Sequence, residues 1–180
     1  RMAQMKTPGV YIIEKNAFPN SVVEVATAIP AFIGHTQFAR DGNKDLTGIP
    51  FRISSMAEFH SFFGFAPTLR FGIRPEDSES EDTTNDINVL FPDGSCQLTL
   101  PKTFYALYYN MLLFYANGGG PCYIVSVGDY EHDFKSIDFT NALLALKKEQ
   151  EPTLVVVPEA VYMEEGDCYK VQTAALMHCG

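Results

Sequence analysis

The fold is decided around residues 104–127, which read FYALYYNMLLFYANGGGPCYIVSV. Apolar residues in the first half recur at helical spacing and share one helix face. They are Phe104, Leu107, Tyr108, Met111, Leu112 and Tyr115. Because Tyr105, Tyr109 and Phe114 widen this surface, we expect a helix over about 103–117 that is buried on more than one side. The glycines 118–120 stop the helix, and residues 122–127 are then typical of a strand.

A second helix and a second strand follow. Residues 139–150 are predicted to be helical, with Asp138 as a cap and Lys147 and Lys148 in the last turn. Leu154-Val155-Val156-Val157 is typical of a strand buried on both faces. The stretch 122–157 therefore predicts a parallel βαβ unit, and a final helix is expected over 169–178. These elements predict an α/β fold in which helices flank a mixed sheet.

Further elements are predicted upstream. Residues 22–25 and 27–29 indicate a strand, Pro30 a turn or bulge, and residues 31–34 a buried strand that ends at Gly34. Ser55 and Glu58 form a capping-box pattern, which predicts a helix over 56–63 that Gly64 closes. The residues between, 35–50, carry turn signals and are expected to form loops.

Residues 70–102 are predicted to be a surface insertion. Turn residues 92–95 lie between two short β segments, 89–91 and 96–100, which predicts a hairpin. Residues 75–86 contain only polar, charged or proline residues, so we expect a solvated acidic loop. Because the ligand spacing of a calcium-binding loop is absent, that alternative is disfavoured.

Residues 1–20 are predicted to form an extended N-terminal arm, and residues 21–180 a core. A turn signal precedes a short segment of high β propensity, and Phe18-Pro19-Asn20 separates it from the core. We expect the arm to contact another subunit through Thr7, Pro8, Gly9, Val10, Tyr11, Ile12 and Ile13. The alternative is that these residues form an edge strand of their own domain.

Composition excludes several function classes. The chain of 180 residues carries a formal net charge of −9, which disfavours binding to nucleic acid and to anionic membranes. No apolar segment is long enough to span a membrane, and the N-terminus lacks a secretory pattern, so we expect synthesis in the cytoplasm. The cysteines 96, 122, 168 and 179 match no metal motif and are expected to be reduced, mostly buried thiols.

Motifs for catalysis are also lacking, so we assign no catalytic, cofactor-binding or metal-binding residue. The glycines 118–120 follow a helix and precede a strand, which is the reverse of a phosphate-binding loop. The four histidines have no partner at metal-ligand spacing. The alternative function is a small α/β enzyme or ligand-binding domain. Its site would lie at the carboxyl ends of strands 122–127 and 154–157, lined by 128–130 and 159–166.

Four segments together resemble contractile tail sheath proteins. They are residues 7–12 with Glu14, residues 25–36, the Ser-led and Gly-ended helix 54–64, and residues 114–128. The order of these segments over 6–128 makes the resemblance specific, and it is closest to sheaths of extracellular contractile injection systems, with phage tails as the near alternative.

The resemblance implies a structural protein without a cofactor. Sheath subunits polymerise around an inner tube and contract to drive that tube through a target envelope, and terminal arms add strands to neighbouring subunits. The implied partners are copies of the chain, the inner tube protein, and baseplate and cap proteins. The implied location is the cytoplasm during assembly, followed by release as an extracellular phage-tail-like particle or virion tail.

One departure from the family concerns the C-terminal portion, which completes the sheath core and contacts the tube. Because this sequence stops after a helix, at Gly180, we expect it to be part of a longer protein. No tube-contact residue is therefore carried over. An adaptor or receptor-binding module of a similar particle remains an alternative.

Overall fold

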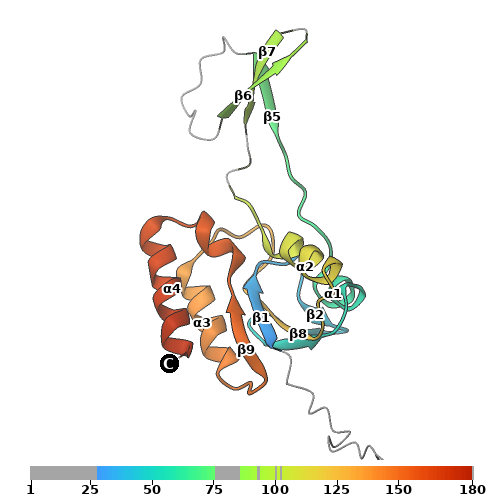
Figure 1. The fold of residues 1–180 in the computed structure, drawn as a ribbon, viewed down its shortest axis with the longest axis vertical. Helices are drawn as coiled ribbons and strands as arrows, with labels where there is room; N and C mark the ends of the chain where they lie inside the picture. The colour runs from blue at the N-terminus through green and yellow to red at the C-terminus, as the bar shows by residue number, and fades with distance from the viewer. Residues whose placement is uncertain (1–27, 76–85, 93, 100, 102, 180) are drawn as a thin grey trace, which may run out of the picture.

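The computed structural model describes residues 28–75, 86–92, 94–99, 101 and 103–179 (Figure 1). The predicted arm, residues 1–20, the predicted strand residues 22–25, and most of the acidic loop lie outside the described residues.

The main sheet has four strands in the order β4-β8-β1-β9. These are β1 (Ile29–Gly34), β4 (Phe51–Ile53), β8 (Cys122–Ser126) and β9 (Pro152–Val156). β1 runs parallel to both β8 and β9, whereas β4 is antiparallel to β8. The sheet is therefore mixed and the predicted α/β class is confirmed, with β1 lying between the two strands of the predicted βαβ unit.

Helices cover both faces of this sheet (Figure 1). They are α1 (Met56–Phe63), α2 (Leu107–Ala116), α3 (Ser136–Leu146), the short 3-10 helix η1 (Pro158–Tyr162) and α4 (Glu165–Cys179). α3 and α4 pack on one face, and α1 and α2 on the other. Within the described residues, no helix is long and apolar enough to cross a membrane.

Strand alternation builds two cores, one on each side of the sheet. In β8, Tyr123 and Val125 face α3 and α4, whereas Ile124 faces α1 and α2. In β1, Ile33 faces α3 and α4, whereas Phe32 faces α1 and α2. Because side chains alternate along a strand, a continuous apolar run supplies both cores at once.

The predicted helix ends need partial correction. α1 has the predicted bounds, and the Glu58 N–H donates to Ser55 Oγ at 3.2 Å. The Glu58 carboxylate, however, accepts from the Ser54 N–H at 2.6 Å and not from the cap residue itself. α3 begins at Ser136, so Asp138 lies in its first turn instead of capping it, and α4 begins earlier than predicted.

Two burial predictions are wrong. α2 is buried on one side only, through Leu107 and Met111, while Leu113 is 65% exposed. β9 is an edge strand covered on one face, and its Leu154 is 54% exposed. Apolar sequence alone does not distinguish burial within one chain from an exposed apolar face.

The predicted insertion contains a small sheet of three strands that stands away from the α/β body (Figure 1). β6 (Asp86–Phe91) and β7 (Gly94–Thr99) form the predicted hairpin. β5 (Gly72–Pro75), which was not predicted, pairs with the other side of β7. The short hairpin of β2 (Arg40–Asp41) and β3 (Lys44–Asp45) was also not predicted, since both were expected to be loop.

A buried polar cluster joins β1, α2 and η1. Glu159 Oε2 accepts from the His35 backbone N–H at 2.9 Å and lies 2.7 Å from His35 Nδ1. Glu159 Oε1 accepts from the Leu107 N–H at 3.4 Å, at the start of α2. This tertiary contact explains why the helix begins at Leu107 and not at residue 103, because the carboxyl group satisfies a free N–H of its first turn. A side chain at Gly34 would place its Cβ 2.9 Å from Leu107 Cβ, so this approach requires glycine.

Removal of the Glu159 carboxyl group should strongly destabilise the fold. We expect Glu159→Ala to lower the free energy of unfolding by about 3–5 kcal/mol, because it leaves buried N–H groups without an acceptor. Glu159→Gln, which keeps one acceptor, should lose less. Urea denaturation measures both, with the exposed Glu131→Ala as control, and a loss below about 1 kcal/mol for Glu159→Ala would contradict the role given to the cluster.

The four cysteines are free thiols, but only Cys122 is buried, so the prediction of mostly buried thiols is wrong. Burial raises the pKa of Cys122 to about 11. At about pH 8, iodoacetamide should therefore modify exposed Cys179 quickly and Cys122 only after unfolding, since the thiolate is the nucleophile. Peptide mass mapping before and after denaturation checks this; equal labelling of both thiols in the native chain would show that β8 is accessible.

Candidate assembly surface

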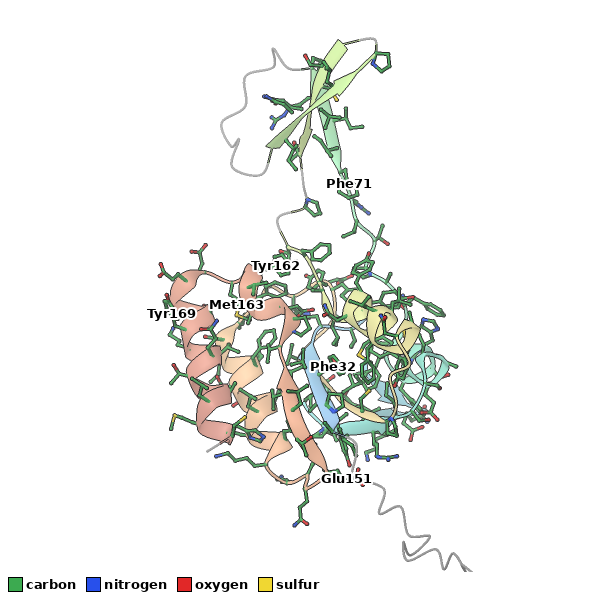
Figure 2. The ribbon with its side chains drawn as sticks, viewed as in Figure 1. Phe32, Phe71, Glu151, Tyr162, Met163 and Tyr169 are labelled. Atoms are coloured by element: carbon green, nitrogen blue, oxygen red, sulfur yellow. The ribbon has the colours of Figure 1, made fainter. Side chains whose placement is uncertain are left out.

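An apolar groove of about 520 Å³ runs between α2 and the amino-terminal end of β1. Phe32 and Ile29 of the sheet and Leu113 and Phe114 of α2 are among its lining residues (Phe32 is labelled in Figure 2). The rings of Phe32 and Phe114 lie 5.2 Å apart in an edge-to-face arrangement. We call this feature the α2 groove.

The glycines after α2 shape one end of the groove. Gly118 has a φ of 82°, a conformation that favours glycine, and it reverses the chain after the helix. The Gly119 N–H donates to the Phe114 carbonyl at 2.9 Å, and a Cβ at Gly119 would lie 2.5 Å from the Phe114 ring. The predicted role of these glycines as a helix stop is confirmed, and they also let Phe114 lie against the turn.

β9 forms an open edge of the main sheet, next to the α2 groove on the sheet face that α1 and α2 cover. Leu154 is paired with Pro30, and Val156 with Phe32, so β9 continues the sheet beside the floor of the α2 groove. Among the described residues, β9 has no strand on its outer side. An open edge offers unpaired N–H and C=O groups to another strand, and exposed Leu154 offers an apolar contact. We call the α2 groove and the β9 edge together the assembly surface.

The predicted arm residues Thr7–Ile13 lie outside the described residues. Ala28, the first described residue, lines the α2 groove. The N-terminal segment therefore joins the described part of the chain at this surface. The groove was not predicted from the sequence. The signal that could have indicated it was the wide apolar surface of the helix predicted over 103–117.

A polar hollow of about 460 Å³ lies at the carboxyl ends of β1 and β8. The alternative hypothesis placed a ligand site at the ends of strands 122–127 and 154–157, so the hollow matches it at β8 only, and no residue of β9 or of 159–166 lines it. Gly128 and Asp129 line it as predicted. Tyr130 instead donates its hydroxyl to the Phe65 carbonyl at 2.9 Å, and Glu159 is buried against His35.

The polar groups of the hollow mainly bind one another. Ser126 Oγ lies 2.6 Å from Thr36 Oγ1. This hydroxyl is therefore hydrogen-bonded to another hydroxyl and not to a histidine ring, as an activated serine nucleophile would be. His132 Nδ1 lies 2.5 Å from Asp129 Oδ1 at the exposed rim. The Glu131 backbone N–H and the His132 ring lower the pKa of Asp129, so this carboxylate stays ionised near neutral pH. Within the described residues, no group of His, Cys, Asp and Glu is arranged to hold a metal ion.

The two sides of α2 should respond differently to substitution. We expect Leu113→Asp to lower the free energy of unfolding by about 1 kcal/mol or less, because the side chain is exposed and the cost is that of an aspartate in the last turn of a helix. Met111→Ala, on the buried side, should cost about 2–5 kcal/mol through the cavity it leaves. Parallel urea titrations make the comparison, and a large loss for Leu113→Asp would mean that the groove wall is core.

Comparison with known proteins assigns no family to the chain. No protein-family model matches it, and a search of curated proteins finds no significant match. The functional inference therefore rests on the chain's own residues and surfaces and on the resemblance of its sequence segments 6–128 to contractile tail sheath proteins.

Proposed function

We propose that this protein is a structural subunit of a contractile sheath, which polymerises around an inner tube and contracts to drive that tube through a target cell envelope. One observation carries the proposal: an open strand edge lies beside an apolar groove, in a chain whose N-terminus contains a Pro-Gly-led β segment. The sequence resemblance over residues 6–128 supports the same assignment.

Strand addition supplies the subunit contact in this proposal. Thr7–Ile13 of one copy pairs with the β9 edge of another, main-chain hydrogen bonds provide affinity, and apolar side chains contact Leu154 and the α2 groove. The intervening residues 14–27 can span at most about 50 Å when extended. That distance exceeds the diameter of a domain of this size, whose radius of gyration is about 15 Å, so a neighbouring copy lies within reach.

Contraction requires no covalent chemistry. Two lattice packings of the same subunit differ in free energy, and the difference summed over many copies drives the tube. The arm keeps subunits connected while their other contacts rearrange. A nucleotide or metal plays no part in this mechanism.

The partners in this proposal are copies of the chain, the inner tube protein, and baseplate and cap proteins. The particle assembles in the cytoplasm and is released as a phage-tail-like particle or virion tail. The net charge of −9 favours contacts with neutral or basic protein surfaces over nucleic acid or anionic lipid.

Assembly should depend on the arm and on β9 but not on exposed apolar residues in general. We expect the protein encoded by the complete reading frame to form tubes or rings in negative-stain micrographs, and deletion of residues 1–15 or Leu154→Asp to abolish them. Leu144→Asp is the matched control, because Leu144 on α3 is 55% exposed and Leu154 is 54% exposed.

Sedimentation velocity provides the second measurement for the same variants. The Leu154→Asp and Leu144→Asp variants should remain folded by circular dichroism, since both side chains are exposed in the isolated chain. If the protein encoded by the complete reading frame stays monomeric at every concentration, or if tubes persist after deletion of the arm, the proposal is refuted.

The second candidate function is a ligand-binding domain or enzyme that uses the polar hollow. It is favoured by the hollow's position at the carboxyl ends of parallel strands, where α/β proteins bind ligands. Substitution of Asp129 would then abolish ligand binding, whereas deletion of residues 1–15 would not. In the sheath proposal, deletion of residues 1–15 abolishes assembly and substitution of Asp129 does not, so the two functions are distinguishable.

A further inference from the structure

The N-terminal segment joins the described chain beside the open edge of β9. Ile29, the first residue of β1, pairs with Pro152, the first residue of β9, so the two strands begin side by side. Ala28 precedes this pair and lines the α2 groove. The residues that lead to the predicted arm are therefore attached at the chain's own assembly surface.

Two features of this surface are open in the described chain. Among the described residues, no strand pairs with the outer side of β9. Leu154 is 54% exposed and lies on the same sheet face as Val156, which packs toward α1 and α2. A strand added at this edge would pair the backbone groups of β9 and cover Leu154.

The length of residues 14–27 matches the distance to this edge. β9 has five residues and is about 17 Å long, and a strand on its outer side would lie about 10 Å from β1. A random coil of 14 residues has a root-mean-square end-to-end distance of about 20 Å. The effective concentration of a tethered segment is highest when these lengths agree, and it is of the order of 1 mM for a short linker.

We infer that residues 7–13 add to the β9 edge of their own chain in the free subunit, and that assembly exchanges this arm for the arm of a neighbouring copy. At protein concentrations well below about 1 mM, a tethered arm outcompetes the arm of another copy. Exchange of identical segments restores the same hydrogen bonds, so it requires little free energy. The exchange rests on the proposed function, whereas closure within the free chain does not.

Closure of the arm would regulate polymerisation. The edge of a free subunit is occupied, so copies do not join at low concentration. In a growing sheath, neighbouring copies are held close together and their arms reach the edge at high local concentration. The two alternatives for residues 7–13, a contact with another subunit and an edge strand of their own domain, are then two states of one segment.

A labelled peptide tests whether the edge is occupied. The probe is a fluorescein-labelled synthetic peptide of residues 1–15, and fluorescence anisotropy measures its binding in about 0.15 M NaCl. The chain without residues 1–15 should bind this peptide. The 180-residue chain, at concentrations where sedimentation velocity shows a monomer, should bind it at least about tenfold more weakly. This ratio corresponds to an effective concentration of about 1 mM and a peptide Kd of about 0.1 mM or tighter.

Matched controls separate strand addition from charge attraction, because the peptide carries three basic residues and one acidic residue. The same peptide with Tyr11→Pro and Ile12→Pro keeps its charge but loses two consecutive N–H groups, so it should not bind. In the chain without residues 1–15, Leu154→Asp should weaken binding of the wild-type peptide about tenfold, which corresponds to about 1.4 kcal/mol. Leu144→Asp, at an equally exposed position, should leave binding unchanged.

A second variant serves if the truncated chain fails to fold by circular dichroism. The 180-residue chain with Tyr11→Pro and Ile12→Pro keeps its length but cannot pair its arm as a strand. It should bind the wild-type peptide at least about tenfold more tightly than the unmodified chain does.

Equal binding of the peptide to the chains with and without a working arm would overturn the proposal, because it would show that the edge is free. Binding to neither chain, or binding that Leu154→Asp leaves unchanged, would also overturn it, since the arm would then not occupy this edge. If the 180-residue chain excludes the peptide only when it sediments as a dimer or larger, the occupant is the arm of a second copy and closure within one chain is wrong. Tube formation by the complete protein is a separate measurement, so failure of arm closure and failure of the sheath proposal are distinguishable.

Discussion

The rest of the structure depends on the buried Glu159 carboxyl group. It is the shared acceptor for the backbone of His35 at the end of β1 and for the first N–H of α2, and it lies against the His35 ring. Burial of a carboxyl group is costly unless its partners are complete. Because these partners come from separate elements, the cluster determines where α2 begins and where the chain turns after β9. Gly34 permits the arrangement, since it leaves space for Leu107 and Glu159 beside the strand.

The position of α2 explains the assembly surface. α3 and α4 cover one face of the sheet, while α1 and α2 cover the other face over β4, β8 and β1. The same face is left open beside β9, which gives rise to the α2 groove and the exposed Leu154. An exposed apolar face beside an open strand edge is unfavourable for an isolated chain. Addition of another strand would pair the backbone groups of the edge and cover the apolar face.

The small sheet is structurally separate from the two cores of the α/β body. It stands away from the body (Figure 1), and neither core includes a described residue of β5, β6 or β7.

The sequence by itself determined the elements whose signals are local. α1 is an example, because Ser55 and Gly64 cap it within a few residues, and the β6–β7 hairpin follows from its turn residues. The apolar runs of β1 and β8 also indicated a sheet with helices on both sides. Only the tertiary structure decided which apolar residues are covered. Leu154 and Leu112 were predicted to be buried, but both are exposed, because burial depends on which elements pack against them. The short strands β4 and β5 carry too few residues for a local signal and exist through pairing with β8 and β7. Glu159 and His35 are 124 residues apart, and a contact between such distant residues has no local pattern from which it could be predicted.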